Sequence, residues 1–124
     1  MAKVKQLTVS LENRPGALAQ MAQVLADAKV NVVALLGSTA GEQGSAQVVV
    51  DQTSKAKKAL DKAGMSYTEG TLEQFELNNK PGVLAEVAGK LAKKGINIDS
   101  AYGAMPKGAR KGVLLVATSQ QSGS

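Results

Sequence analysis

The chain contains a short segment whose residue types could bind an anion, and it contains that segment twice. Asn13-Arg14-Pro15-Gly16-Ala17-Leu18 recurs 66 residues later (13 to 79) as Asn79-Lys80-Pro81-Gly82-Val83-Leu84. The Pro-Gly pair precedes an apolar-periodic run, which predicts a turn into a helix with proline at its first position and asparagine as a candidate cap. A helix N-terminus lined by glycine presents N–H groups and a positive dipole end to an anion. Either these are two anion sites, or both are only strand-to-helix joints.

The composition excludes most catalytic chemistry. The 124 residues include no His, Cys or Trp, and aromatic residues make up 2%. Imidazole acid–base chemistry, thiol nucleophiles, disulfides and soft-metal sites are therefore ruled out. The carboxylates form no paired motif. We expect a protein that is not an enzyme and has no metal and no cofactor.

The charge pattern argues against nucleic acid as a partner. The net charge of +5 is spread over both halves without a basic tail, which is typical of a solvated surface. Of two basic clusters, Lys55-Lys57-Lys58 is expected on a helix face in solvent, and Lys107 with Arg110-Lys111 in a hairpin loop could contact phosphates. The chain shows no signal-peptide pattern and no long apolar run, so we expect a cytoplasmic protein without membrane association.

The apolar periodicity predicts a ferredoxin-like α+β fold. The first half is predicted to contain strands at 4–11, 30–36 and 45–51 and a fourth strand from Met65. A helix from Pro15 follows the first strand, and its apolar face is predicted to carry Leu18, Met21, Ala22, Leu25 and Ala28. A second helix, capped by Thr53 or Ser54 and closed by Gly64, follows the third strand. This βαββαβ order places both helices on one face of an antiparallel sheet.

The second copy is predicted to be incomplete. A strand near 72–77, a helix at 81–94 and strands at 96–101 and 113–117 are present, whereas the last helix and strand are missing. We therefore predict a domain at 1–70, a truncated βαββ domain at 71–119 and a disordered tail at 120–124. The truncation leaves an apolar face and a strand edge uncovered. We expect copy one or a second chain to cover them, and hence a homodimer or higher oligomer.

The repeated turn, the helix after it and the Asn-Val or Asn-Ile pair beyond resemble the ACT domain, and the whole chain resembles the stand-alone tandem ACT proteins. The resemblance implies a regulatory protein of amino-acid metabolism that binds an effector such as an amino acid where two domains or subunits meet. It also implies allosteric action on a partner enzyme. It implies two sets of ligand-binding residues: Asn13, Arg14, Pro15, Gly16, Ala17, Leu18, Asn31 and Val32 in copy one, and Asn79, Lys80, Pro81, Gly82, Val83, Leu84, Asn97 and Ile98 in copy two.

Other roles remain open for several of these residues. Arg14 and Lys80 could be solvated charges, and Asn31 and Asn97 could bond the backbone of their own turns. Copy one is predicted to form a complete βαββαβ domain, so it is expected to hold the more complete site. The alternative functions are an interaction or assembly module without a metabolite, or an RNA-binding ferredoxin-like domain. For the RNA-binding alternative, Phe75 is the one candidate strand aromatic that could stack a base, and the RNP pattern is absent.

Overall fold

The computed structural model describes residues 2–118 and divides into two compact units. Lys5–Gly70 forms one, termed the first-repeat unit, and residues 2–4 with 71–118 form the other, termed the second-repeat unit. The predicted tail at 120–124 lies outside the described residues. Within residues 2–118, no helix has the length and apolar character that a membrane span requires.

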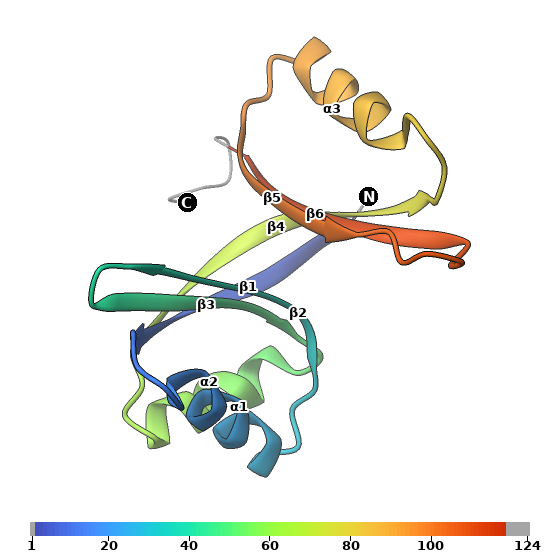
Figure 1. The fold of residues 1–124 in the computed structure, drawn as a ribbon. Helices are drawn as coiled ribbons and strands as arrows, with labels where there is room; N and C mark the ends of the chain where they lie inside the picture. Colours follow the sequence, from blue (N-terminus) through green and yellow to red (C-terminus); the bar gives the residue numbers. More distant parts are fainter. Residues whose placement is uncertain (1, 119–124) are drawn as a thin grey trace. The chain divides into compact units, whose positions relative to one another are not determined.

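The first-repeat unit has the ferredoxin-like order. Its elements are β1 (Ala2–Glu12), α1 (Ala17–Asp27), β2 (Val32–Ala40), β3 (Gln43–Val50), α2 (Thr53–Lys62) and the start of β4 (Tyr67–Asn78). The strands lie in the order β2-β3-β1-β4, and β3 pairs antiparallel with both β1 and β2. The two helices contact each other and cover one face of the sheet (Figure 1). The predicted α+β fold class is confirmed.

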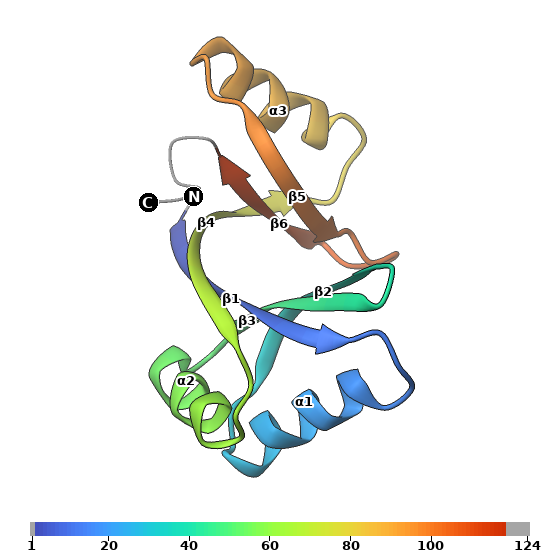
Figure 2. The same cartoon turned by 90° about the vertical axis from the view of Figure 1, so that its left-hand side faces the viewer.

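The second-repeat unit has a single helix. The end of β4 leads to α3 (Val83–Lys93), β5 (Ile98–Ala104) and β6 (Lys111–Thr118). The strand order is β4-β6-β5, with β6 antiparallel to both neighbours. The beginning of β1 belongs to this unit and neighbours β4, so residues 2–4 take the sheet position of the fourth strand of the motif. Figure 2 shows α3 alone against these strands, without a counterpart of α2.

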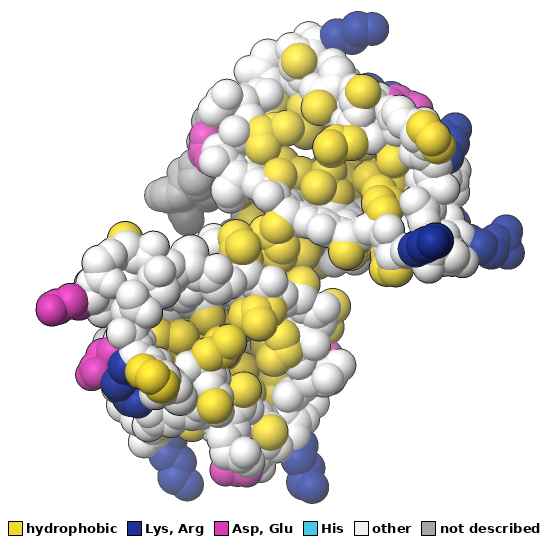
Figure 3. All heavy atoms as spheres, viewed as in Figure 1, with side chains coloured by type: hydrophobic (Ala, Val, Ile, Leu, Met, Phe, Trp, Pro, Cys, Tyr) yellow, Lys and Arg dark blue, Asp and Glu magenta, His cyan; other side chains and the backbone are white. Residues whose placement is uncertain are grey.

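Each unit has its own apolar core, and Figure 3 shows hydrophobic side chains gathered within each of the two units. The first-repeat core contains ten buried residues: Leu7, Val9, Met21, Leu25, Val30, Ala46, Val48, Val50, Ala56 and Leu60. The second-repeat core contains four: Leu77, Val87, Leu91 and Val116. The smaller core follows from the missing helix, because no second helix removes its strands and α3 from water.

Two strand predictions need correction. The separate strands expected near residues 65 and 72 are one continuous β4 of 12 residues. The flexible turn expected at 37–44 is also mostly strand, because β2–β3 pairing continues to Ala40 opposite Gln43. The hydroxyl groups of Ser38 and Ser45 lie 3.3 Å apart across this pair, so small polar residues extend the hairpin instead of forming a loop.

The apolar face of α1 is rotated from the predicted one. Ala17, Met21 and Leu25 are buried, whereas Leu18 is 44% exposed and Ala22 is exposed. A 3.6-residue period fits either face, and the position of the sheet selects the one that begins at Ala17. Leu18 is therefore left at the surface, where it lines a pocket described below.

The ends of α2 match the sequence prediction only in part. Gln52 is the N-cap and makes no side-chain capping bond, so the expectation for Thr53 or Ser54 is wrong. Gly64 closes the helix as predicted: its φ is +73°, and its N–H donates to the Asp61 carbonyl oxygen. The left-handed conformation is the one glycine adopts without a Cβ penalty.

Candidate ligand-binding site

Each repeated turn ends in a glycine with a left-handed backbone. Gly16 has φ +86° and Gly82 has φ +88°, and each is the N-cap of the helix that follows. The helix starts one residue later, so Pro15 precedes the cap and does not occupy the first helical position as expected. A Cβ built on either glycine would meet no atom within 4 Å. The requirement for glycine is therefore conformational.

The first turn of each helix leaves backbone donors available. In α1 the Gln20 N–H donates to the Gly16 carbonyl oxygen at 2.9 Å, and the Ala17 N–H makes a longer contact with Arg14 O at 3.3 Å. The N–H groups of Gly16 and Leu18 have no acceptor among residues 2–118. The pattern repeats in α3, where the N–H groups of Gly82 and Leu84 also have no described acceptor. These groups, at the positive end of the helix dipole, can bind a carboxylate.

The repeated asparagine ties the turn to a hairpin and does not cap the helix. The Asn13 side-chain amide donates to the Gly41 carbonyl oxygen at 2.8 Å. Asn79 donates to two carbonyl oxygens of the β5–β6 connection, Pro106 O at 3.0 Å and Ala109 O at 2.8 Å. Both asparagines thus hold the β-hairpin against the turn, which corrects the expected capping role.

Replacing Asn79 by alanine is expected to lower the free energy of unfolding by about 1–3 kcal/mol, because two hydrogen bonds are lost and one of them is partly buried. Asn13→Ala removes a single exposed bond and is expected to cost less. Urea unfolding of both variants measures the difference. Equal losses would show that the second bond of Asn79 contributes nothing.

A pocket of about 440 Å³ lies between the second turn and the β5–β6 hairpin, wholly within the second-repeat unit. Its wall is apolar and comes from both hairpin strands and the helix start. The turn contributes Lys80 and Gly82. The complete lining is Leu77, Lys80, Gly82, Val83, Leu84, Ala101, Tyr102, Gly103, Ala104, Met105, Val113 and Leu114. Burial raises the pKa of Tyr102 above its ordinary value, so its phenol is neutral at physiological pH.

The first-repeat unit has the corresponding pocket, of about 400 Å³, with a more polar lining. It is formed by Leu11, Glu12, Asn13, Arg14, Ala17, Leu18, Gly37, Ser38, Thr39, Gly44 and Ser45. The Arg14 guanidinium is already engaged: its Nε lies 3.1 Å from the Glu12 carboxylate and its Nη2 lies 3.0 Å from the Gln20 side-chain oxygen. Lys80, at the same repeat position, has no carboxylate partner among the described residues.

Within each unit, the asparagine after the helix does not line the pocket. The N–H of Asn31 donates to the Asp51 carboxylate at 2.9 Å, and the Asn97 side-chain amide donates to the Asp99 carboxylate at 3.0 Å. Val32 is partly buried against the first-repeat core, and Ile98 is partly buried against the second-repeat core. Of the predicted residues, the first-repeat pocket is lined by Asn13, Arg14, Ala17 and Leu18, and the second-repeat pocket by Lys80, Gly82, Val83 and Leu84. Asn31, Val32, Asn97 and Ile98 line neither pocket, and neither do the turn residues Pro15, Gly16, Asn79 and Pro81.

The hairpin residues of the pockets were not among the predicted site residues. The repeat itself carries the signal that could have found them, since Gly37 and Gly103 occupy the same repeat position and each lines its pocket. Among residues 2–118, no group of His, Cys, Asp or Glu side chains could hold a metal ion.

The basic clusters are partly neutralised. Lys57 pairs with Glu69 at 3.1 Å, and this hydrogen bond and charge raise the pKa of Lys57. In the hairpin cluster, Lys111 lies 3.3 Å from the Glu76 carboxylate. Neither cluster therefore presents the full positive charge that its sequence suggests.

The fold and the pockets together define a class of protein: two ferredoxin-like units, each with a glycine-capped helix start that faces its own β-hairpin across a small pocket. The model of the ACT domain pair matches residues 2–123, and the chain belongs to that family. No curated protein matches the chain.

Solved structures share the fold. Protein BT0572 from Bacteroides thetaiotaomicron is similar at 28% sequence identity and a TM-score of 0.88, over 94% of this chain and 80% of that chain. The ligand-free regulatory subunit of aspartate kinase from Thermus thermophilus is similar at 16% identity and a TM-score of 0.67, over 92% and 82% of the two chains. The regulatory subunit of aspartate kinase from Thermus flavus is similar at 18% identity and a TM-score of 0.59, over 93% of this chain and 85% of that chain.

Proposed function

We propose that this protein is a regulatory protein that binds a small apolar amino acid in the pocket of the second-repeat unit. The observation that carries the proposal is the composition of that pocket. Its lining includes Lys80 together with Gly82 and Leu84, whose N–H groups have no described acceptor. The rest of the lining is an apolar wall that includes Met105 and Leu114. The helix start and the lysine suit a carboxylate, and the apolar wall suits an aliphatic or aromatic side chain.

The size of the pocket supports a small ligand. Its volume of about 440 Å³ falls in the range of roughly 300–1,000 Å³ found for small-molecule sites. A ligand with the few heavy atoms of an amino acid can gain only a limited binding free energy, so the expected Kd is about micromolar to millimolar.

The first-repeat pocket is proposed as the weaker site. Its cation, Arg14, is held by Glu12 and Gln20, so binding a carboxylate there would first require breaking those contacts. Its wall carries hydroxyl groups of Ser38, Thr39 and Ser45 in place of apolar side chains. The more complete site was expected in copy one from the sequence, whereas the stronger site is proposed in copy two.

Regulation would follow from what the pocket joins. A ligand between the turn and the hairpin contacts both, so it would favour arrangements in which they are close, and a ligand shifts an equilibrium by its differential affinity. Membership of the ACT family supports this role, and the two Thermus proteins above are by name regulatory subunits of aspartate kinase. We propose action in the cytoplasm, without catalysis by this chain, on a partner enzyme linked to amino-acid metabolism.

The proposal includes a homodimer or higher homo-oligomer. Val33 is 59% exposed and Leu35 is 45% exposed on β2, which lies at the edge of the strand order of its unit. Exposed apolar side chains along an edge strand support pairing with another chain.

A thermal-shift screen of the twenty amino acids tests the ligand. One or more apolar amino acids are expected to raise Tm by several degrees at tenfold excess over Kd, since such an excess stabilises the folded state by about 1.4 kcal/mol. Lys80→Ala is expected to weaken binding by about tenfold, because a charge-assisted hydrogen bond is lost.

Arg14→Ala is the matched control at the equivalent repeat position, and it should leave the affinity unchanged. No shift with any amino acid at 10 mM would contradict the proposed ligand. Loss of binding in Arg14→Ala but not in Lys80→Ala would move the site to the first-repeat unit.

A further inference from the structure

The second-repeat unit has an apolar groove that nothing in that unit covers. The groove lies between β4 and α3, has a volume of about 370 Å³ and is distinct from the turn–hairpin pocket apart from Leu77 and Val83. Its floor contains Phe75, Leu77 and Leu91.

In the first-repeat unit, the helix α2 covers the surface that corresponds to this groove. This second helix buries Ala56 and Leu60 completely in the core beneath it. Val9, on β1, has no exposed surface, whereas Phe75 at the same repeat position is only partly buried. The geometry of the groove is therefore that of a site for one amphipathic helix.

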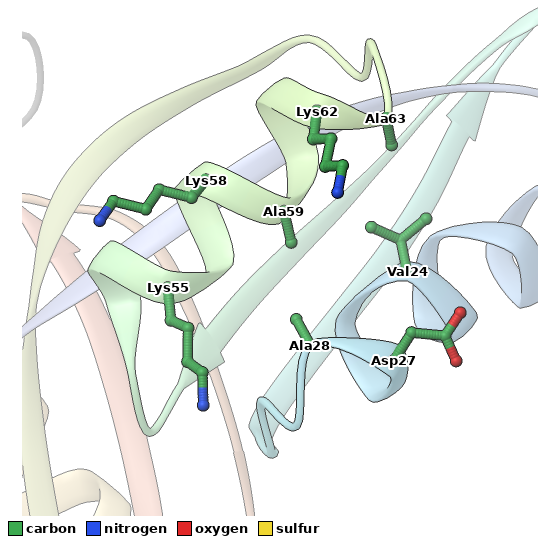
Figure 4. A pocket seen from close by; sticks show the side chains of 8 residues that line it. All are labelled: Val24, Asp27, Ala28, Lys55, Lys58, Ala59, Lys62 and Ala63. Atoms are coloured by element: carbon green, nitrogen blue, oxygen red, sulfur yellow. The ribbon is translucent and has the colours of Figure 1, made fainter.

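The rim of the groove defines the charge of that helix. Figure 4 shows Val24 and Ala28 of α1 directed toward α2 across the gap between the two helices. The same repeat positions of α3 are Lys90 and Lys94, and both line the groove. Two carboxylates also line the groove, and each is already paired: Glu86 with Lys90 at 3.7 Å and Glu76 with Lys111 at 3.3 Å. Lys94 has no carboxylate partner among the described residues, so its ammonium is the charge on the rim that a partner can neutralise.

We propose that the groove between α3 and β4 binds an amphipathic helix of a partner protein, with acidic side chains placed against Lys90 and Lys94 and an apolar stripe over Phe75. An α2 helix from a second copy of this chain is disfavoured. Figure 4 shows Lys55 and Lys62 on the side of α2 that faces α1, so this helix would bring like charges to the lysine rim. The inference is independent of the amino-acid pocket.

A peptide pair tests the proposal with the full chain. The probe is a fluorescein-labelled, hydrocarbon-stapled peptide with the sequence of residues 53–63 in which the four lysines are replaced by glutamate; the staple is needed because so short a helix is marginal in water. The control peptide keeps the lysines. Fluorescence anisotropy is expected to show saturable binding of the acidic peptide, with Kd of about tens of micromolar, and at least tenfold weaker binding of the lysine peptide.

Charge reversal on the protein identifies the surface. In the double variant Lys90→Glu with Lys94→Glu, the affinity for the acidic peptide is expected to fall at least tenfold. The variant is expected to bind the lysine peptide instead. Lys93→Glu is the matched control, since Lys93 is exposed on the same helix turn but does not line the groove, and it should change neither affinity by more than about twofold.

Three results would overturn the proposal. The acidic peptide could fail to bind the unmodified chain up to 1 mM, or both peptides could bind it equally, and neither result depends on how the variants fold. Sedimentation could also show a self-association that the peptide competes with and that the double variant abolishes, in which case the groove holds a second copy.

Discussion

Replacing Leu25 by alanine is expected to lower the free energy of unfolding by about 2–5 kcal/mol. Leu25 is 1% exposed and packs in the ten-residue core of the first-repeat unit. Two helices and the sheet enclose that core, so neighbouring side chains can fill the resulting cavity only in part. Urea unfolding, with the midpoint and the slope both recorded, measures the loss.

Leu91→Ala is the matched control, because Leu91 holds the same repeat position in the second-repeat unit. It is 7% exposed and lines the groove beside α3. Truncation there widens an existing groove without creating a closed cavity, so the expected loss is at the lower end of the range, about 2 kcal/mol. An equal or larger loss at Leu91 would show that the groove is closed in solution.

Replacing Gly103 by alanine is expected to destabilise the protein by about 1–3 kcal/mol and to abolish amino-acid binding. Gly103 lies opposite Leu114 in the β5–β6 pair and lines the second-repeat pocket. A Cβ at this position would collide with the carbonyl oxygen of Val113 and approach the Leu114 Cα to 3.0 Å. Both obstacles are backbone atoms, so one strand of the hairpin must move.

Gly37→Ala makes the same change at the same repeat position and serves as the control. A Cβ on Gly37 would meet no atom within 4 Å, so the expected change in stability is within about 0.5 kcal/mol. Urea unfolding and calorimetric titration with the amino acid selected by the screen measure both effects. Equal tolerance of the two substitutions would contradict the close strand approach at Gly103.

The sequence repeat predicted the order of the elements and the fold class, because the period of apolar residues changes from 2 to 3.6 at the same places in both copies. It did not predict the continuity of β4. Gly70 and its polar neighbours interrupt the alternation of apolar residues there, and the strand is continuous because its two ends belong to the sheets of different units.

The candidate site was predicted only on its turn side. Short-range signals such as Pro-Gly identify where a helix starts, whereas the pocket wall comes from residues about 20 to 30 positions later in the chain. The role of Asn79 illustrates the limit: capping is a local property that sequence indicates, but its partners, Pro106 and Ala109, are brought near only by the hairpin.

The most direct test of amino-acid binding in the second-repeat pocket is a titration followed by amide chemical shifts in a ¹⁵N–¹H NMR spectrum. Saturable shifts are expected at Gly82, Leu84 and Tyr102, with little change at Gly16 and Leu18 below the Kd of the weaker site. Shifts confined to Gly16 and Leu18, or no saturable shift with any apolar amino acid, would contradict the proposed site.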